Sequence, residues 1–340
     1  MSLKVDIFAH IVPPKYKAHV ESRPHPGHAP MEYVDIVPSI TDLEARFRAM
    51  DRYPDVLQML TNAAHIPSDI EGPKEALELS MRLNDEMAEL VQKYPDRFAG
   101  AAAVVPLNDI DAALKELERA IGDLRLRGLL IRVPINDKGP DQPEFMPLYE
   151  AMTRYNLPIW IHPQKRGDTP DYASEKYGSK YNIWHVWGII YETTVAMTRL
   201  VFSGVLQKYP DLKIITHHCG AMVPYFSDRI NSHYDLAEMR HAPQRDFKRG
   251  LNEKPIEFFR KFYNDTVLGG NTSALMCAYE FFGAEHLLFG TDAPYDAQFG
   301  ATITGGIIDA IQRMEIPESE KKKIFLDNAI KLCRLPLSPM

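Results

Sequence analysis

The stretch HLLFGTDAP at residues 286–294 decides the fold, because it is an apolar run that ends in a carboxylate. Two earlier stretches have the same form with a histidine at the end, KVDIFAH at 4–10 and LPIWIH at 157–162, and KIITHHC at 213–219 carries two histidines. Parallel strands buried on both faces form continuous apolar runs, and barrels built from them collect reactive side chains at the carboxyl ends of the strands. The pattern predicts an α/β fold with four polar residues at one end of a parallel sheet: His10, His162, His218 and Asp292.

Eight such apolar runs alternate with stretches of helical period. The predicted strands are 4–10, 55–63, 98–106, 128–134, 158–163, 213–220, 261–267 and 286–294. The helical stretches include 75–95 and 109–124, and Asp109 is placed to cap the second of them. Eight alternations favour a closed barrel over an open sheet, and no glycine-rich nucleotide loop follows a strand. We therefore predict a single domain, residues 1–340, folded as a (β/α)8 TIM barrel.

Two long segments interrupt the alternation. Residues 21–41 follow the first strand and are rich in proline and histidine, while residues 164–187 follow the fifth strand and are rich in tyrosine and tryptophan. Long connections in compact domains are usually lids or binding loops, so we expect both on the catalytic face. Trp184 and His185 are candidates for contact with a planar substrate; a hydrophobic lid or a dimer contact is the alternative for this aromatic stretch.

The composition excludes several classes of protein. The net charge is −7 and no block rich in lysine or arginine occurs, which argues against a nucleic-acid partner. No run of about 18 apolar residues is present, so we expect no membrane span. Three cysteines in 340 residues do not form a disulfide framework, which indicates a reducing compartment and a cytoplasmic location.

The polar strand ends suggest a metal site. His10, His162 and Asp292 come from the first, fifth and eighth predicted strands, and this donor set suits Zn²⁺, with Mn²⁺ or Fe²⁺ as alternatives. Each residue taken singly is also typical of a buried polar group or a turn. His218 stands outside the set and is a candidate general acid or base together with Asp292. Strand alternation predicts that its neighbour His217 points toward the helices and serves packing.

Several longer motifs carry a family resemblance over nearly the whole chain. They are DIFAHIVPP (6–14), MDRYPDVLQML (50–60), IWIHP (159–163), GVLQKYPDLKIITHHCGAMVPYFSDRI (204–230) and HLLFGTDAP (286–294). With these motifs the chain resembles the amidohydrolase-2 group of the amidohydrolase superfamily. The resemblance implies a (β/α)8 barrel, one divalent metal without an organic cofactor, and nonoxidative decarboxylation. At the matching positions it implies His10, His162 and Asp292 as ligands and His218 as the base.

Phe8 departs from this resemblance. The family's first motif supplies two ligands one residue apart, whereas Phe8-Ala9-His10 supplies only the second. A phenyl ring cannot coordinate a metal, although three protein ligands and a water still form an ordinary catalytic zinc site. Three outcomes stay open: a metal enzyme with three protein ligands, a metal-free enzyme that uses His218 and Asp292, and a catalytically silent barrel.

Arginines supply the expected contacts with a substrate carboxylate. In the family resemblance, Arg229 binds this group across a dimer interface, which predicts a homodimer. Arg46 and Arg48 resemble a second carboxylate-binding region, and Arg132 lies near the end of the fourth predicted strand. The predicted function is a metal-dependent nonoxidative decarboxylase of a small aromatic or enoic carboxylic acid. The alternatives are a metal-dependent hydrolase or hydratase of a ring-cleavage or lactone-type metabolite, and a silent binding barrel.

Overall fold

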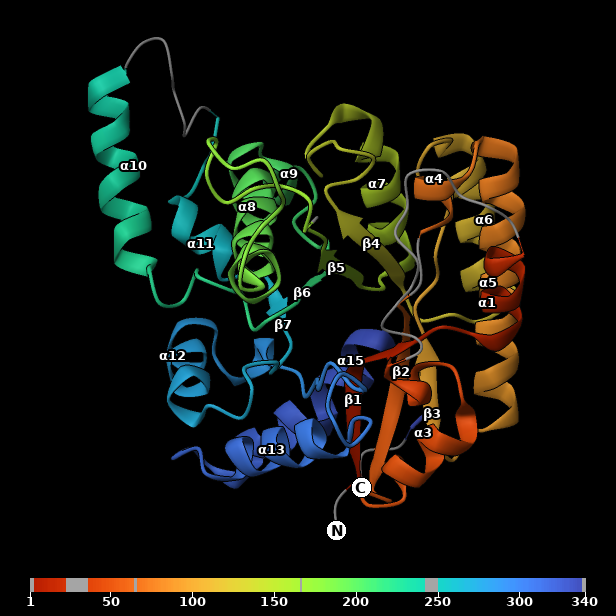
Figure 1. Ribbon diagram of the computed structural model, residues 1–340. Helices are drawn as coiled ribbons and strands as arrows, with labels where there is room; N and C mark the ends of the chain where they lie inside the picture. The colour runs from red at the N-terminus through yellow and green to blue at the C-terminus, as the bar shows by residue number, and fades with distance from the viewer. Residues whose placement is uncertain (1–2, 23–35, 64–65, 166, 242–249, 338–340) are drawn as a thin grey trace.

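The computed structural model describes residues 3–22, 36–63, 66–165, 167–241 and 250–337. Figure 1 shows the strands in the middle of the molecule and most of the helices around them. The strands are β1 (Lys4–Ile11), β2 (Val56–Asn62), β3 (Phe98–Ala101), β4 (Leu129–Val133), β5 (Ile159–Pro163), β6 (Ile214–Thr216) and β7 (Tyr263–Asn264). They form two parallel sheets, with the orders β1-β2-β3 and β4-β5-β6-β7.

The helices alternate with the strands along the chain. They are α1 (Pro14–Glu21), α3 (Leu43–Met50), α4 (Pro67–Ile70), α5 (Pro73–Lys93), α6 (Ile110–Gly122), α7 (Met146–Tyr155), α8 (Ile189–Phe202), α9 (Val205–Lys208), α10 (Ser227–His241), α11 (Pro255–Phe259), α12 (Thr272–Phe282), α13 (Ala301–Gln312), α14 (Glu318–Lys322) and α15 (Asn328–Cys333). Short helical turns are η1 (Pro38–Ile40), η2 (Pro143–Phe145), η3 (Trp184–Gly188), η4 (Ala284–His286) and η5 (Lys323–Asp327). None of the described helices is long and apolar enough to span a membrane.

The two sheets are linked by backbone hydrogen bonds at both junctions. Between β3 and β4, the Ala103 N–H donates to Gly128 O at 2.8 Å and the Leu130 N–H donates to Ala103 O at 2.8 Å. On the other side, residues 287–293 lie between β7 and β1. There the Leu288 N–H donates to Asn264 O at 2.8 Å, and the Ile7 N–H donates to Phe289 O at 2.9 Å.

The first seven predicted strands are present in the predicted order, and all but the first were predicted longer than they are. The sixth ends at Thr216, because His218 and Cys219 have left-handed φ angles of 58° and 53° that no strand accommodates. The eighth predicted strand, 286–294, is not a regular strand, although its backbone bonds both neighbours; Asp292 there has a φ of 64°. The Asp109 cap is confirmed, since its side chain accepts from the Ala112 N–H at 3.0 Å.

The loop after β5 keeps its predicted place. It runs without regular helix from β5 to η3, so it begins beside His162 at the carboxyl end of the sheet. Its tyrosines are exposed, with 82% of Tyr177 accessible to solvent. Most of the other predicted loop, 21–41, lies outside the described residues.

A buried polar contact fixes the end of β3 to the helices. Asn84 on α5 is fully buried; its Nδ2 donates to Val104 O at 2.8 Å and to Glu116 Oε1 at 2.6 Å, and its Oδ1 accepts from the Val104 N–H at 2.9 Å. We expect Asn84→Ala to lower the free energy of unfolding by about 2–4 kcal/mol, because it leaves several buried polar groups without hydrogen-bond partners. Urea denaturation followed by circular dichroism measures this. The exposed Arg82→Ala on the same helix is the control and should change stability by less than about 0.5 kcal/mol.

Candidate metal centre

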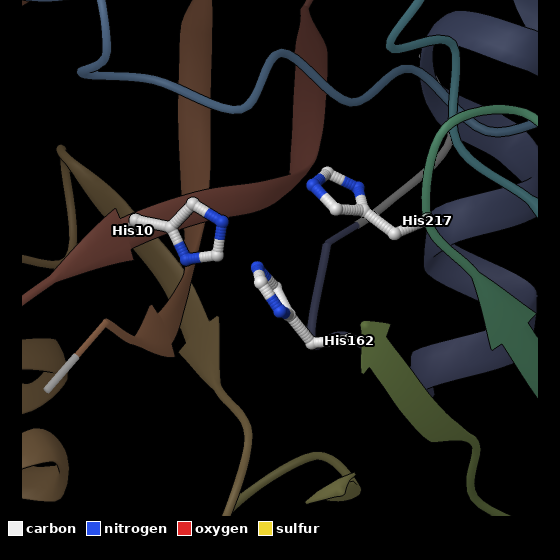
Figure 2. A group of neighbouring side chains, drawn as sticks. All are labelled: His10, His162 and His217. Atoms are coloured by element: carbon white, nitrogen blue, oxygen red, sulfur yellow. The ribbon is translucent and has the colours of Figure 1, made fainter. Parts of the chain in front are cut away.

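Three histidine side chains converge at the carboxyl ends of the strands. They are His10 at the end of β1, His162 at the end of β5 and His217 just after β6, and Figure 2 shows their rings facing a common centre. One nitrogen from each lies within 4.8 Å of the others. The ring centroids of His10 and His162 are 5.1 Å apart, as are those of His162 and His217.

Asp292 completes the cluster. Its Oδ1 lies 2.9 Å from His10 Nε2 and 3.3 Å from His217 Nε2. The Asp292 N–H donates to Phe8 O at 3.0 Å, which fixes the carboxylate beside the end of β1. Burial alone would raise the pKa of Asp292, but the neighbouring His217 and His10 hold it well below its ordinary value. Asp292 therefore stays anionic, as a metal ligand must.

The hydrogen bonds of His10 and His162 leave one nitrogen of each ring available to coordinate a metal. His162 Nδ1 contacts Pro163 O at 2.6 Å and must donate to it, so its Nε2 keeps a lone pair. His10 Nδ1 contacts Thr61 Oγ1 at 3.1 Å, while its buried Nε2 makes no hydrogen bond of acceptable geometry within the described residues. Burial lowers the pKa of both rings, so both are neutral, the form that binds metals.

His217 is the first correction to the sequence analysis. It was predicted to face the helices, yet its side chain is fully buried inside the cluster. β6 ends one residue earlier and the chain turns at His218, so the alternation of a regular strand does not apply. Its Nδ1 is hydrogen-bonded to Asp265 Oδ2. Burial disfavours the charged ring, but the carboxylates of Asp265 and Asp292 outweigh it and raise the pKa of His217 to about 9.

Asp265 is a residue that the sequence analysis missed. It follows β7, is fully buried, and accepts hydrogen bonds from the backbone N–H groups of His218 (3.1 Å), Cys219 (2.8 Å) and Val267 (3.0 Å). The available signal was the one acidic residue of the strand candidate KFYNDTV.

His218 lies beside the cluster, as predicted. Its ring centroid is 3.9 Å from that of His217, and a ring nitrogen lies within 4.8 Å of donors from His217 and Asp292. Its buried Nδ1 has no hydrogen-bond partner among the described residues. Burial and the neighbouring His217 hold the pKa of His218 well below its ordinary value, so the ring is neutral and able to accept a proton.

The predicted substrate arginines occupy different environments. Arg132 on β4 is paired with His162 in the sheet; its Nη2 donates to Ala63 O at 2.8 Å and its buried Nε has no partner among the described residues. Arg229 lies on α10 and is exposed to solvent in the single chain. Trp184 and His185 belong to η3, and His185 is close enough to His218 to help lower the pKa of His218.

Arg46 and Arg48 differ in burial and in their contacts. Arg46 is buried, with its Nη1 donating to His10 O at 2.7 Å and its Nε donating to Gln58 Oε1 at 2.9 Å. Its guanidinium therefore holds the end of β1 in place, while its buried Nη2 has no hydrogen-bond partner among the described residues. Arg48 lies on the surface of α3 beside Glu44. The sequence motif could not distinguish these environments, because they depend on how α3 packs against the sheet.

Asp6 supports the strand that carries His10. Its carboxylate accepts from the Phe8 N–H (3.1 Å), the Thr291 N–H (3.0 Å) and the Thr291 hydroxyl (2.5 Å) at an irregularity in the pairing of β1 with β2. Burial is the largest influence on this group and outweighs these hydrogen bonds, so the pKa of Asp6 rises from 3.8 to about 6.

This pKa predicts a dependence of stability on pH. The folded state holds the Asp6 proton more tightly than the unfolded state. The protonated carboxyl therefore contributes fully to the free energy of unfolding below the unfolded pKa, and this contribution is lost as pH rises through about 6. Asn resembles the neutral acid, so Asp6→Asn should gain roughly 2 kcal/mol relative to the parent between about pH 4 and pH 7. Urea titrations of both metal-free proteins at several pH values measure this, and parallel curves would contradict it.

A family model matches nearly the whole chain. The model described as amidohydrolase matches residues 5–335, which include the whole cluster. The chain belongs to the amidohydrolase family. This match confirms the resemblance seen in the motifs.

Several proteins of similar sequence and structure are decarboxylases. The chain is 31% identical to γ-resorcylate decarboxylase from Polaromonas sp. strain JS666, over 86% of this chain and 87% of the relative. The structure of 5-carboxyvanillate decarboxylase from Sphingomonas paucimobilis superposes with a TM-score of 0.82 at 26% identity, covering 98% of this chain and 100% of the other. A dihydroxybenzoic acid decarboxylase from Polaromonas sp. JS666, solved with manganese and 2-nitroresorcinol, gives a TM-score of 0.78 at 26% identity, covering 99% and 98%.

Proposed function

We propose that this amidohydrolase is a divalent-metal-dependent nonoxidative decarboxylase of a small aromatic carboxylic acid. The observation that carries the proposal is the cluster of His10, His162 and Asp292 at the strand ends, with His218 beside it. The nitrogen and oxygen donors fit a first-row divalent ion, and the buried His10 Nε2, which lies 2.9 Å from Asp292 Oδ1, is the kind of atom that a metal would use. We keep zinc as the predicted ion; manganese in a related decarboxylase makes it the first alternative to test.

Each part of the site has its own role in the proposed decarboxylation. When bound, the metal supplies a Lewis-acid centre that polarises substrate oxygen atoms. As the bond from the ring carbon to the carboxylate breaks, its electron pair stays on the ring carbon, which must receive a proton. We assign delivery of this proton to His218, which must first take it up from the substrate or from solvent at its Nδ1, an atom without a partner among the described residues. We assign the substrate carboxylate to Arg132 Nε, a buried atom without a partner among the described residues, and the substrate ring to Trp184 and His185 on η3.

A substrate screen tests the proposal. Protein purified without a polyhistidine tag and loaded with Zn²⁺, Mn²⁺ or Fe²⁺ is mixed with hydroxylated benzoic acids, starting with 2,6-dihydroxybenzoate, the ligand of a related decarboxylase structure. We expect release of carbon dioxide and formation of the corresponding phenol, both dependent on metal. Metal-loaded protein that leaves every acid in the panel unchanged would refute the proposed reaction.

We further infer a single domain, residues 1–340, closed as a (β/α)8 barrel. Support comes from the backbone hydrogen bonds at both junctions of the two sheets, where residues 287–293 stand in the place of the eighth strand. One cooperative unfolding transition, identical by fluorescence and circular dichroism, is the expected result. Two separated transitions would indicate independent units.

A homodimer and a cytoplasmic location complete the proposal. Large apolar side chains are exposed on and near the helix that carries Arg229, including Tyr225 (78%) and Met239 (82%). We expect a dimer by light scattering at micromolar concentration and a higher KM for Arg229→Ala; a monomer would remove the role of Arg229 across the interface. The three cysteines are free, which is consistent with a reducing compartment.

A further inference from the structure

The Phe8 side chain occupies the position where a first ligand is missing. It is fully buried among the histidines, with its ring centroid 5.3 Å from that of His10 and 5.9 Å from that of His162. Its closest partner is His217, at 4.0 Å with an angle of 14° between the ring planes. The phenyl ring is therefore stacked flat against one particular histidine.

His217 has the support that a metal-binding histidine needs. Its Nδ1 is held by Asp265, and that carboxylate is itself fixed by the three backbone N–H groups described above. A carboxylate that accepts the hydrogen of one ring nitrogen orients the other nitrogen toward a metal, as in many zinc sites. Here the other nitrogen, Nε2, lies 3.3 Å from Asp292 Oδ1 and faces the centre shared with His10 and His162.

The neighbouring His218 lacks this support. Its Nδ1 has no hydrogen-bond partner among the described residues, and its side chain is less buried than that of His217. The group of three histidines within 4.8 Å contains His217, whereas His218 joins only a group without His10 and His162. The two adjacent histidines thus have different environments, one fixed toward the centre and one free to meet a substrate.

We propose that His217 replaces the ligand that Phe8 removes, so that His10, His162, His217 and Asp292 hold the metal. Phe8 fixes the His217 ring by stacking, and the hydrogen bond to Asp265 keeps the remaining proton on Nδ1 when Nε2 gives up its proton to bind the metal. This assignment rests on the proposed function, because it requires that a divalent metal binds. It explains how a chain with phenylalanine at the first ligand position retains four protein donors.

Metal binding by four proteins tests the assignment without relying on activity. Metal-free wild type, His217→Gln, His218→Gln and Phe8→His/His217→Gln are titrated with Co²⁺, followed by visible absorption, and with Mn²⁺, followed by calorimetry. We expect His217→Gln to weaken binding at least about 100-fold and to change the Co²⁺ spectrum, since a lost ligand should cost more than a lost supporting hydrogen bond. His218→Gln should bind within about threefold of wild type. The double variant should recover most of the affinity, because it returns a donor at residue 8.

The outcomes separate this inference from the proposed function. If His217→Gln binds Co²⁺ as tightly as wild type, the inference is wrong whether or not the protein is a decarboxylase. Wild type that binds metal through His217 but decarboxylates nothing would refute only the proposed function, and wild type that binds no metal would overturn both. If His217→Gln does not fold, Asp265→Asn replaces it, with an expected loss of about 10- to 100-fold in affinity; unchanged affinity there would also overturn the inference.

Discussion

Replacing Asp292 with asparagine is expected to strip the protein of metal and to reduce decarboxylation by roughly 1,000-fold or more. The Asp292 carboxylate lies 2.9 Å from His10 Nε2 and 3.3 Å from His217 Nε2, so it contacts both of these rings. An amide is neutral and turns part of its surface into a donor, which repels a cation. The affinity loss should therefore exceed the roughly 10- to 100-fold that removal of a supporting hydrogen bond causes.

The measurement is metal per chain after dialysis, by elemental mass spectrometry, together with kcat at saturating Mn²⁺. Asp309→Asn serves as the control, because Asp309 is exposed on α13 and its loss should leave both quantities unchanged. Full metal content with full activity in Asp292→Asn would exclude Asp292 as a ligand. Full metal content with low activity would instead assign it a role in proton transfer alone.

His218→Ala should have the second largest effect and a different signature. We expect kcat to fall by about 10²- to 10⁴-fold, the usual contribution of a positioned acid or base, while metal content and melting temperature stay near those of wild type. The reason is its environment: His218 lies beside the cluster, yet its Nδ1 has no partner among the described residues.

Steady-state kinetics in parallel with metal analysis separates this role from that of a ligand. His233→Ala, at an exposed position of α10, is the control for a general effect of losing a histidine. Loss of metal together with activity in His218→Ala would place His218 among the ligands. Unchanged activity would mean that another group delivers the proton to the ring carbon.

Much of the site was predictable because strand ends in a parallel α/β protein are visible in sequence. Apolar runs that stop at His10, His162 and Asp292 predicted that these residues meet, and they do. The periodic apolar positions of α5 and the cap at Asp109 follow equally local rules, which is why those helices begin and end close to their predicted positions.

Only the tertiary structure decided which of two adjacent histidines faces the centre. His217 turns inward because β6 stops after three residues and Asp265, nearly fifty residues later, captures its Nδ1. The environment of Arg46 was decided in the same way, since the packing of α3 brings its guanidinium against the His10 carbonyl. The sequence by itself determined the family, the strand order and most of the polar cluster, because those follow from local pattern and motif. The orientation of each side chain depended on partners distant in the chain, which no local pattern encodes.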